Sequence, residues 1–136
     1  MTKVLIDTNI LVSAALFPQS IPAQAYMKSV VPPYEAMVCD YSVDELRRVF
    51  NTKFPHRLQD YERFVSVMTL AVKIVPVPVE EQYEEDVNKI RDINDRPIFR
   101  AAVAAETDIL ITGDKDFLEA GIKAPTIVTA AEFLKS

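Results

Sequence analysis

The sequence predicts a three-layer α/β/α domain, in which helices cover both faces of a mainly parallel, five-stranded central sheet. Short apolar runs rich in β-branched residues are typical of buried strands. Segments with apolar residues at three- and four-residue steps separate these runs, as expected of helices that pack on a sheet. Strands that alternate with helices favour a parallel sheet. The 136 residues are enough for one substantial core, so we expect a single domain over residues 1–136.

Each expected strand is a run of mostly apolar residues without glycine. The first run stops abruptly at Asp7, and the fourth ends in the turn sequence Thr112-Gly113-Asp114. Such runs fit strands that are buried on both faces. The expected strands cover residues 4–6, 36–39, 72–77, 109–112 and 126–128.

The segments between the strands carry helix signals. Pro22 suits a first helical turn, and Ser42 followed by Glu45 fits the capping box that starts many helices. Residues 98–105 are small and apolar almost all round, which indicates a buried helix. The expected helices cover residues 10–16, 22–30, 43–50, 55–68, 80–91, 98–105 and 130–134.

Composition limits the class of protein. A hydrophobic content of 49% with 26% charged residues indicates a folded globular chain. The sequence contains no signal peptide and no apolar run near the roughly 20 residues that span a bilayer, so we expect a cytoplasmic protein. Cys39 is the only cysteine and lies in an apolar run, which favours a core thiol. The net charge of −5 disfavours a nucleic-acid partner, unless the acids gather where a bound cation reverses their effect.

Acidic residues follow three of the expected strands. Asp7 follows the first strand, Asp40 the second with Glu45 one helical turn later, and Asp114 the fourth. Because ligands bind beyond the carboxyl ends of parallel strands, we expect these acids to converge at one edge of the sheet. Carboxylates that share a cleft repel one another, and a hard divalent cation such as Mg²⁺ or Mn²⁺ relieves the repulsion.

Each acid also has a structural explanation of its own. Asp7 and Asp95 fit helix N-caps, Glu45 fits the capping box, and Asp114 fits a Gly-Asp turn. Any one of these explanations is reasonable. Their common position at strand ends favours a shared site instead.

Four stretches of the sequence resemble the PIN-domain family, and in particular its toxin subgroup akin to the VapC-type ribonucleases. These stretches are "VLIDTNILVSAAL", "SVDELRRVF", "RDINDRPIFRAAVAAETDILITGDKDF" and "TIVTAAEFL", and they span almost the whole chain in order. The resemblance implies a ribonuclease that uses Mg²⁺ or Mn²⁺ to hydrolyse phosphodiester bonds of single-stranded RNA. It also implies a homodimer and a small antitoxin protein that holds the enzyme inactive.

The resemblance implies the following site residues. Asn9 and Thr112 match polar positions that orient the ligands in relatives. Relatives often carry a denser acidic run near Asp95, so Asp92 stays an alternative ligand, although the spacing to Ile98 favours Asp95. The acids that match the family's catalytic and metal-binding positions are Asp7, Glu45, Asp95 and Asp114, with Asp116 as a further metal ligand.

A basic cluster follows Glu45 along the chain. Basic side chains near a nuclease site position phosphates, and an ordinary solvated helix edge explains the same residues equally well. The candidates for RNA binding are Arg47, Arg48, Lys53, Arg57 and Lys115.

Other functions fit the sequence less well. A haloacid-dehalogenase-type phosphatase needs an aspartate two residues after the first, where this chain has Asn9. A receiver domain needs an adjacent acid pair after the first strand, and Asp7 stands alone. A catalytically silent PIN-fold module that binds protein or RNA is the stronger alternative. The complete set of acids argues against it, whereas the acidic net charge favours it.

Overall fold

The computed structural model describes residues 1–79 and 84–136. The strands are β1 (Thr2–Ile6), β2 (Tyr34–Cys39), β3 (Lys73–Val75), β4 (Ile109–Ile111) and β5 (Thr126–Val128). The helices are α1 (Thr8–Leu16), α2 (Ile21–Ser29), α3 (Asp40–Lys53), α4 (Leu58–Ala71), α5 (Glu84–Val87), α6 (Arg96–Ala104), α7 (Lys115–Leu118) and α8 (Ala130–Lys135), and the 3₁₀ turn η1 (Pro55–Arg57) precedes α4. Part of the helix expected over residues 80–91 falls on residues 80–83, which lie outside the described residues.

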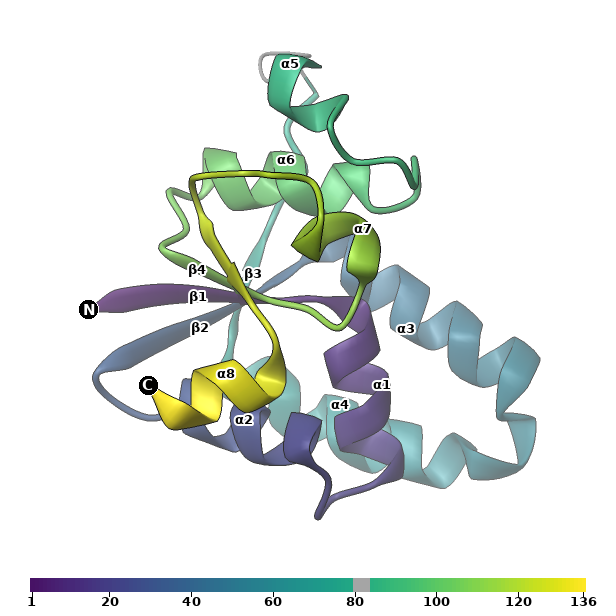
Figure 1. Ribbon diagram of the computed structural model, residues 1–136. Coiled ribbons are helices and arrows are strands. Elements are labelled where there is room, and N and C mark those ends of the chain that lie inside the picture. The colour runs from purple at the N-terminus through teal and green to yellow at the C-terminus, as the bar shows by residue number, and fades with distance from the viewer. Residues whose placement is uncertain (80–83) are drawn as a thin grey trace.

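The five strands form one sheet in the order β3-β2-β1-β4-β5. Every neighbouring pair is parallel, which confirms the predicted fold class. The carboxyl ends of β1, β2 and β4 therefore open at the same edge of the sheet, where α1, α3 and α7 begin (Figure 1).

Side chains alternate between two apolar layers along the central strands. Val4 and Ile6 of β1 pack with α1, α2, α3, α4 and α8 on one face of the sheet. Leu5 lies in the other core, with residues of α5, α6 and α7. Figure 1 shows α1, α2, α4 and α8 below the sheet and α5, α6 and α7 above it. Cys39 is fully buried in the second core, as predicted, and burial raises the pKa of its thiol to about 11.

The start of α3 differs from the expected capping box. The helix begins at Asp40, directly after β2, and its N-cap Cys39 makes no side-chain hydrogen bond. Ser42 is buried within the first turn, where its Oγ accepts a hydrogen bond of 2.9 Å from the Thr8 hydroxyl. The capping-box explanation for Glu45 is therefore wrong, because the Ser42 hydroxyl is used in the core and Glu45 lies inside the helix.

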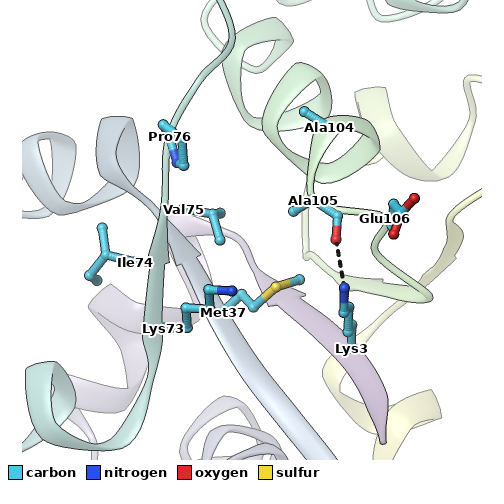
Figure 2. A pocket seen from close by; sticks show the side chains of 9 residues that line it. All are labelled: Lys3, Met37, Lys73, Ile74, Val75, Pro76, Ala104, Ala105 and Glu106. Atoms are coloured by element: carbon cyan, nitrogen blue, oxygen red, sulfur yellow. Dashed lines mark hydrogen bonds between the residues drawn. The ribbon is translucent and has the colours of Figure 1, made fainter.

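In the part of the chain that the structure describes, no helix combines the length and the apolar character that crossing a membrane requires. A hollow of about 310 Å³ lies between β1, β3 and the C-terminal end of α6 (Figure 2). Met37 lies in this hollow, and the Lys3 ammonium donates to the Ala105 carbonyl at 3.4 Å. A cation at a helix C-terminus stabilises the helix dipole, so we assign Lys3 to the stability of α6.

Helix α6 ends in a Schellman motif that has glutamate where glycine is favoured. The Glu106 amide donates to the Val103 carbonyl and the Thr107 amide to the Ala102 carbonyl, both at 3.0 Å. Glu106 has φ of 56°, in the left-handed region that costs a residue with a Cβ.

We therefore expect Glu106→Gly to raise the free energy of unfolding by roughly 0.5–1 kcal/mol, because glycine adopts this φ without the steric cost. Urea unfolding measures the change. The matched control is Ala104→Gly in the last turn of the same helix, which should destabilise by a similar amount. A loss of stability in Glu106→Gly would contradict this account of the turn.

Candidate metal centre

Asp7 lies between the end of β1 and the start of α1. Its amide donates to the Ile111 carbonyl at 3.0 Å, which continues the β1–β4 ladder by one residue. As the N-cap of α1, its Oδ1 accepts from the Thr8 amide at 2.7 Å. Its Oδ2 accepts from the Thr112 hydroxyl, also at 2.7 Å. The capping role and the position at the strand edge thus occur together, and the side chain is only 2% exposed.

The turn after β4 places two more acids beside Asp7. The Thr112 Oγ1 accepts from the Asp114 amide at 3.0 Å, which holds the turn against the end of β1. Asp114 is the N-cap of α7, and its Oδ1 accepts from the Asp116 amide at 2.8 Å. Thr112 therefore contacts the Asp7 carboxylate and the acid-bearing turn at once.

The loop before α6 brings the remaining acids to the same edge. Asp92 forms a local turn, in which its Oδ1 accepts from the Asn94 amide at 2.9 Å. Asp95 lies at the N-cap position of α6 but makes no capping hydrogen bond with its side chain. Its Oδ2 is buried and has no hydrogen-bond partner among the described residues. Capping therefore does not explain Asp95.

Asp92, Asp95, Asp114 and Asp116 each offer a carboxylate oxygen, and these four oxygens lie within 4.8 Å of one another. All four side chains are half-buried, so the site is partly desolvated. A set of oxygen donors alone suits a hard cation such as Mg²⁺ or Mn²⁺. The Asp95 Oδ2 has no hydrogen-bond partner among the described residues, so its lone pairs can bind a cation. The residues present therefore fit such an ion.

Two acids of this edge, Asp7 and Asp95, have raised pKa values and hold their protons more tightly than free carboxylates. Burial raises the pKa of Asp7 to about 6, against the lowering effect of its bonds from Thr112 and Thr8. The charges of Glu45 and Asp114 raise it further. Burial, contact with the Asp114 carboxylate and the charges of Asp7 and Asp92 raise the pKa of Asp95 well above its usual range. Raised pKa values that combine burial with neighbouring carboxylates are typical of sites that take a cation or share a proton.

Glu45 and Asn9 lie at the margin of the acid cluster. Glu45 is half-buried on α3 and is close enough to Asp7 to raise its pKa, but it is not among the four acids that lie within 4.8 Å of one another. Asn9 is exposed in the first turn of α1. The structure thus gathers Asp95 and Asp114 with their neighbours Asp92 and Asp116, and both Asp7 and Glu45 adjoin this group.

The basic candidates differ from one another in their surroundings. Arg47 pairs with Asp44 at 3.5 Å on the exposed side of α3. Arg57 pairs with Asp60 and also donates to the Leu16 carbonyl. These two arginines therefore have structural partners. Lys53, at the end of α3, and Lys115, at the start of α7, are both exposed.

The structure brings two further residues to the site. Arg91 donates from Nη2 and Nε to the Asp116 Oδ1, at 2.9 and 3.0 Å, and its Nη2 lies 3.4 Å from Glu119. Tyr41 lies on α3 near Glu45, which raises its pKa after the larger effect of burial. No sequence pattern indicated Arg91. The spacing of Tyr41 and Glu45, one helical turn apart, is the signal that indicates Tyr41.

The fold and this arrangement of acids agree with a family assignment. Residues 3–116 match the PIN-domain family, so the chain belongs to that family. No curated protein sequence matches the chain.

Several solved structures have the same fold. VapBC2 from Rickettsia felis, solved with a DNA fragment from its promoter, has a TM-score of 0.68 and 14% identity, over 94% of this chain and 98% of that chain. VapC20 from Mycobacterium tuberculosis, described as a toxin that cleaves the sarcin–ricin loop, has a TM-score of 0.66 and 16% identity, over 88% and 96%. FitAcB from Neisseria gonorrhoeae has a TM-score of 0.65 and 19% identity, over 94% and 98%. At these identities, the similarity to the solved structures establishes the fold alone.

We expect Asp95→Asn to stabilise the metal-free protein at high pH. A carboxyl with a raised folded-state pKa stabilises the fold below its unfolded pKa, and this stabilisation is lost as pH rises through the folded-state pKa. At pH 8 in EDTA, the variant should therefore unfold with a free energy roughly 1–3 kcal/mol above that of the unmodified protein. At pH 4 the two should differ little.

Urea unfolding at both pH values tests this prediction. Asp44→Asn, an exposed carboxylate outside the cluster, is the matched control and should show no such pH-dependent gain. Equal or lower stability of Asp95→Asn at pH 8 would show that the Asp95 carboxylate does not destabilise the folded protein.

Proposed function

We propose that the chain is a metal-dependent endoribonuclease that hydrolyses phosphodiester bonds of single-stranded RNA, as the cytoplasmic toxin of a toxin–antitoxin pair. The observation that carries this proposal is the group of four carboxylate oxygens within 4.8 Å, beside the buried Asp7. Two separate segments, the loop before α6 and the turn after β4, supply these acids. Membership of the PIN-domain family and the VapC fold neighbours support the same activity.

Asp7, Asp95 and Asp114 would hold Mg²⁺ or Mn²⁺, with Asp116 or Asp92 as an additional ligand. An ion bound there supplies positive charge for the developing phosphate oxyanion and lowers the pKa of a bound water. Thr112 keeps the Asp7 carboxylate and the Asp114 turn in register through its two hydrogen bonds.

Glu45 has a different role in this proposal. Like Asp7, it lies outside the group of four acids, but it projects from a separate element, α3, from which its carboxylate can accept a proton from the attacking water. The carboxylate would orient the attacking water, either as general base or as a ligand through water.

The proposed function also implies binding partners for the chain. RNA is the substrate, and an antitoxin protein and a second copy of the chain are the expected protein partners. Exposed apolar side chains on neighbouring helices favour a protein partner, since such patches mark interaction surfaces. Met27 of α2 is 61% exposed and Val67 of α4 is 61% exposed, and both line a groove between α1, α2 and α4.

Cleavage of labelled single-stranded RNA tests the activity. The purified protein should cut RNA with Mn²⁺ or Mg²⁺ and not with EDTA. Asp7→Asn should reduce the rate by at least about 100-fold, because an amide cannot supply the negative charge that binds the ion. Circular dichroism confirms that the variant is folded, and Asp44→Asn, on the exposed side of α3, should cut normally.

Equal cutting by the unmodified protein and Asp7→Asn would identify a contaminating nuclease. No cutting of varied RNAs by folded protein free of antitoxin would favour the catalytically silent PIN-fold module instead.

Arg91 should compete with a metal ion for Asp116. The Arg91→Gln substitution frees the Asp116 carboxylate and removes a positive charge that repels the cation. Mn²⁺ should therefore bind roughly two- to fivefold more tightly at low salt. Isothermal titration calorimetry measures the affinity. Lys89→Gln is the control, because Lys89 lines a surface pocket together with Arg91 and Asp116 but pairs with Asp86 at 2.9 Å. Weaker Mn²⁺ binding in Arg91→Gln would instead mean that Arg91 positions Asp116 for the ion.

A further inference from the structure

Three polar side chains lie in a row along one face of helix α3. Tyr41, Glu45 and Arg48 are spaced four and three residues apart, so they lie above one another on successive turns. Leu46 and Phe50 lie on another face of the helix and are fully buried in the core. Because α3 begins at the carboxyl end of β2, the row starts at the edge of the sheet where the acids gather.

Tyr41 and Arg48 are in direct contact. The guanidinium carbon of Arg48 lies 5.6 Å from the centroid of the Tyr41 ring, within the range of a cation–π interaction. No carboxylate in the described part of the chain forms an ion pair with Arg48 within 4.0 Å. The aromatic ring, rather than an acid, therefore holds this arginine.

The pair stands at the rim of the acid cluster. Burial raises the pKa of Tyr41 most, and the charges of Glu45 on the same helix and of Asp95 at the start of α6 raise it further. Arg48 acts in the opposite direction and lowers it. Tyr41 is thus near acids on two elements, and Arg48 is the cation that adjoins it.

The neighbouring Arg47 has different surroundings. It is also exposed and follows Glu45 just as closely in sequence, but it pairs with Asp44. The two adjacent arginines are equal in charge and in their surrounding sequence. Only Arg48 shares a helix face with Glu45.

We propose that Arg48, held by Tyr41, binds the RNA phosphate next to the bond that is cleaved, with Tyr41 as the positioning residue. This inference rests on the proposed ribonuclease function. An arginine fork matches two phosphate oxygens, which a lysine ammonium cannot do. Stacking on the ring restricts the long side chain before RNA binds, so less conformational entropy is lost on binding. A cation at this position also offsets the repulsion between the acid cluster and the phosphate.

The test is the affinity for a fluorescently labelled single-stranded RNA, measured by anisotropy with Ca²⁺ in place of Mg²⁺ and with gels to confirm that the strand stays intact. Arg48→Gln should weaken binding about tenfold and reduce the slope of log affinity against log salt by about 0.7, the value for one phosphate contact on a single strand. Arg47→Gln should change the affinity less than about twofold, because its contact is with Asp44.

Variants of Tyr41 separate positioning from direct contact. Tyr41→Phe keeps the ring and should keep the affinity, whereas Tyr41→Leu removes the ring and should weaken binding about three- to tenfold. Tyr41→Leu combined with Arg48→Gln should be no weaker than Arg48→Gln alone, since Tyr41 acts through the arginine. Thermal unfolding and Ca²⁺ affinity should stay unchanged in Tyr41→Phe and Arg48→Gln.

The possible failures are distinguishable. Equal effects of Arg47→Gln and Arg48→Gln, or an unchanged salt slope in Arg48→Gln, would overturn the role of the pair while RNA binding by the unmodified protein remains. Absence of RNA binding by the folded, unmodified protein would overturn the proposed function and this inference together.

Discussion

The hydrogen bond from the Thr112 hydroxyl to Asp7 is the contact on which the site depends. It joins the ends of β1 and β4, which are neighbours in the sheet, at the edge where the acids gather. Asp7 is 2% exposed, and a buried carboxylate is tolerated only where hydrogen bonds replace its lost water. The Thr8 amide and the Thr112 hydroxyl supply two such bonds at 2.7 Å. Because Thr112 also accepts from the Asp114 amide, one threonine sets the positions of two acids.

The buried and clustered carboxylates at this edge of the sheet lower the stability of the folded protein. Burial raises the pKa of Asp7 despite its two hydrogen bonds, and Asp95 keeps an oxygen without a partner among the described residues. Arg91 offsets part of the repulsion by bridging Asp116 and Glu119. Its side chain is 72% exposed, so water screens most of this effect. A dication at the centre of the cluster would offset far more of the repulsion, because it carries twice the charge and lies closer to every oxygen.

The strands and their acidic ends were predictable because the apolar runs stop abruptly at polar residues, and a parallel sheet then brings these ends together. Helix starts were less predictable. Ser42 has the right spacing to Glu45 for a capping box, but the fold uses its hydroxyl as a core partner for Thr8. Arg91 was beyond prediction, because its partners lie 25 and 28 residues further along the chain and no periodicity links them. The roles of the individual acids remain predictions.

The net charge of −5 is a poor guide to partners in such an arrangement. Phosphate affinity depends on charge within about one Debye length, roughly 8–10 Å, and not on the sum over the chain. The acids at the strand edge are the ones that a bound dication would neutralise. Arg91, from the loop after α5, pairs with one of these acids, Asp116, and Arg48 of α3 lies against Tyr41 near the same edge. With the ion in place, the local field would favour a phosphate even though the whole chain is acidic. Under the proposed function, the charge that an RNA phosphate meets would therefore be set by the bound ion and by the arginines that face it.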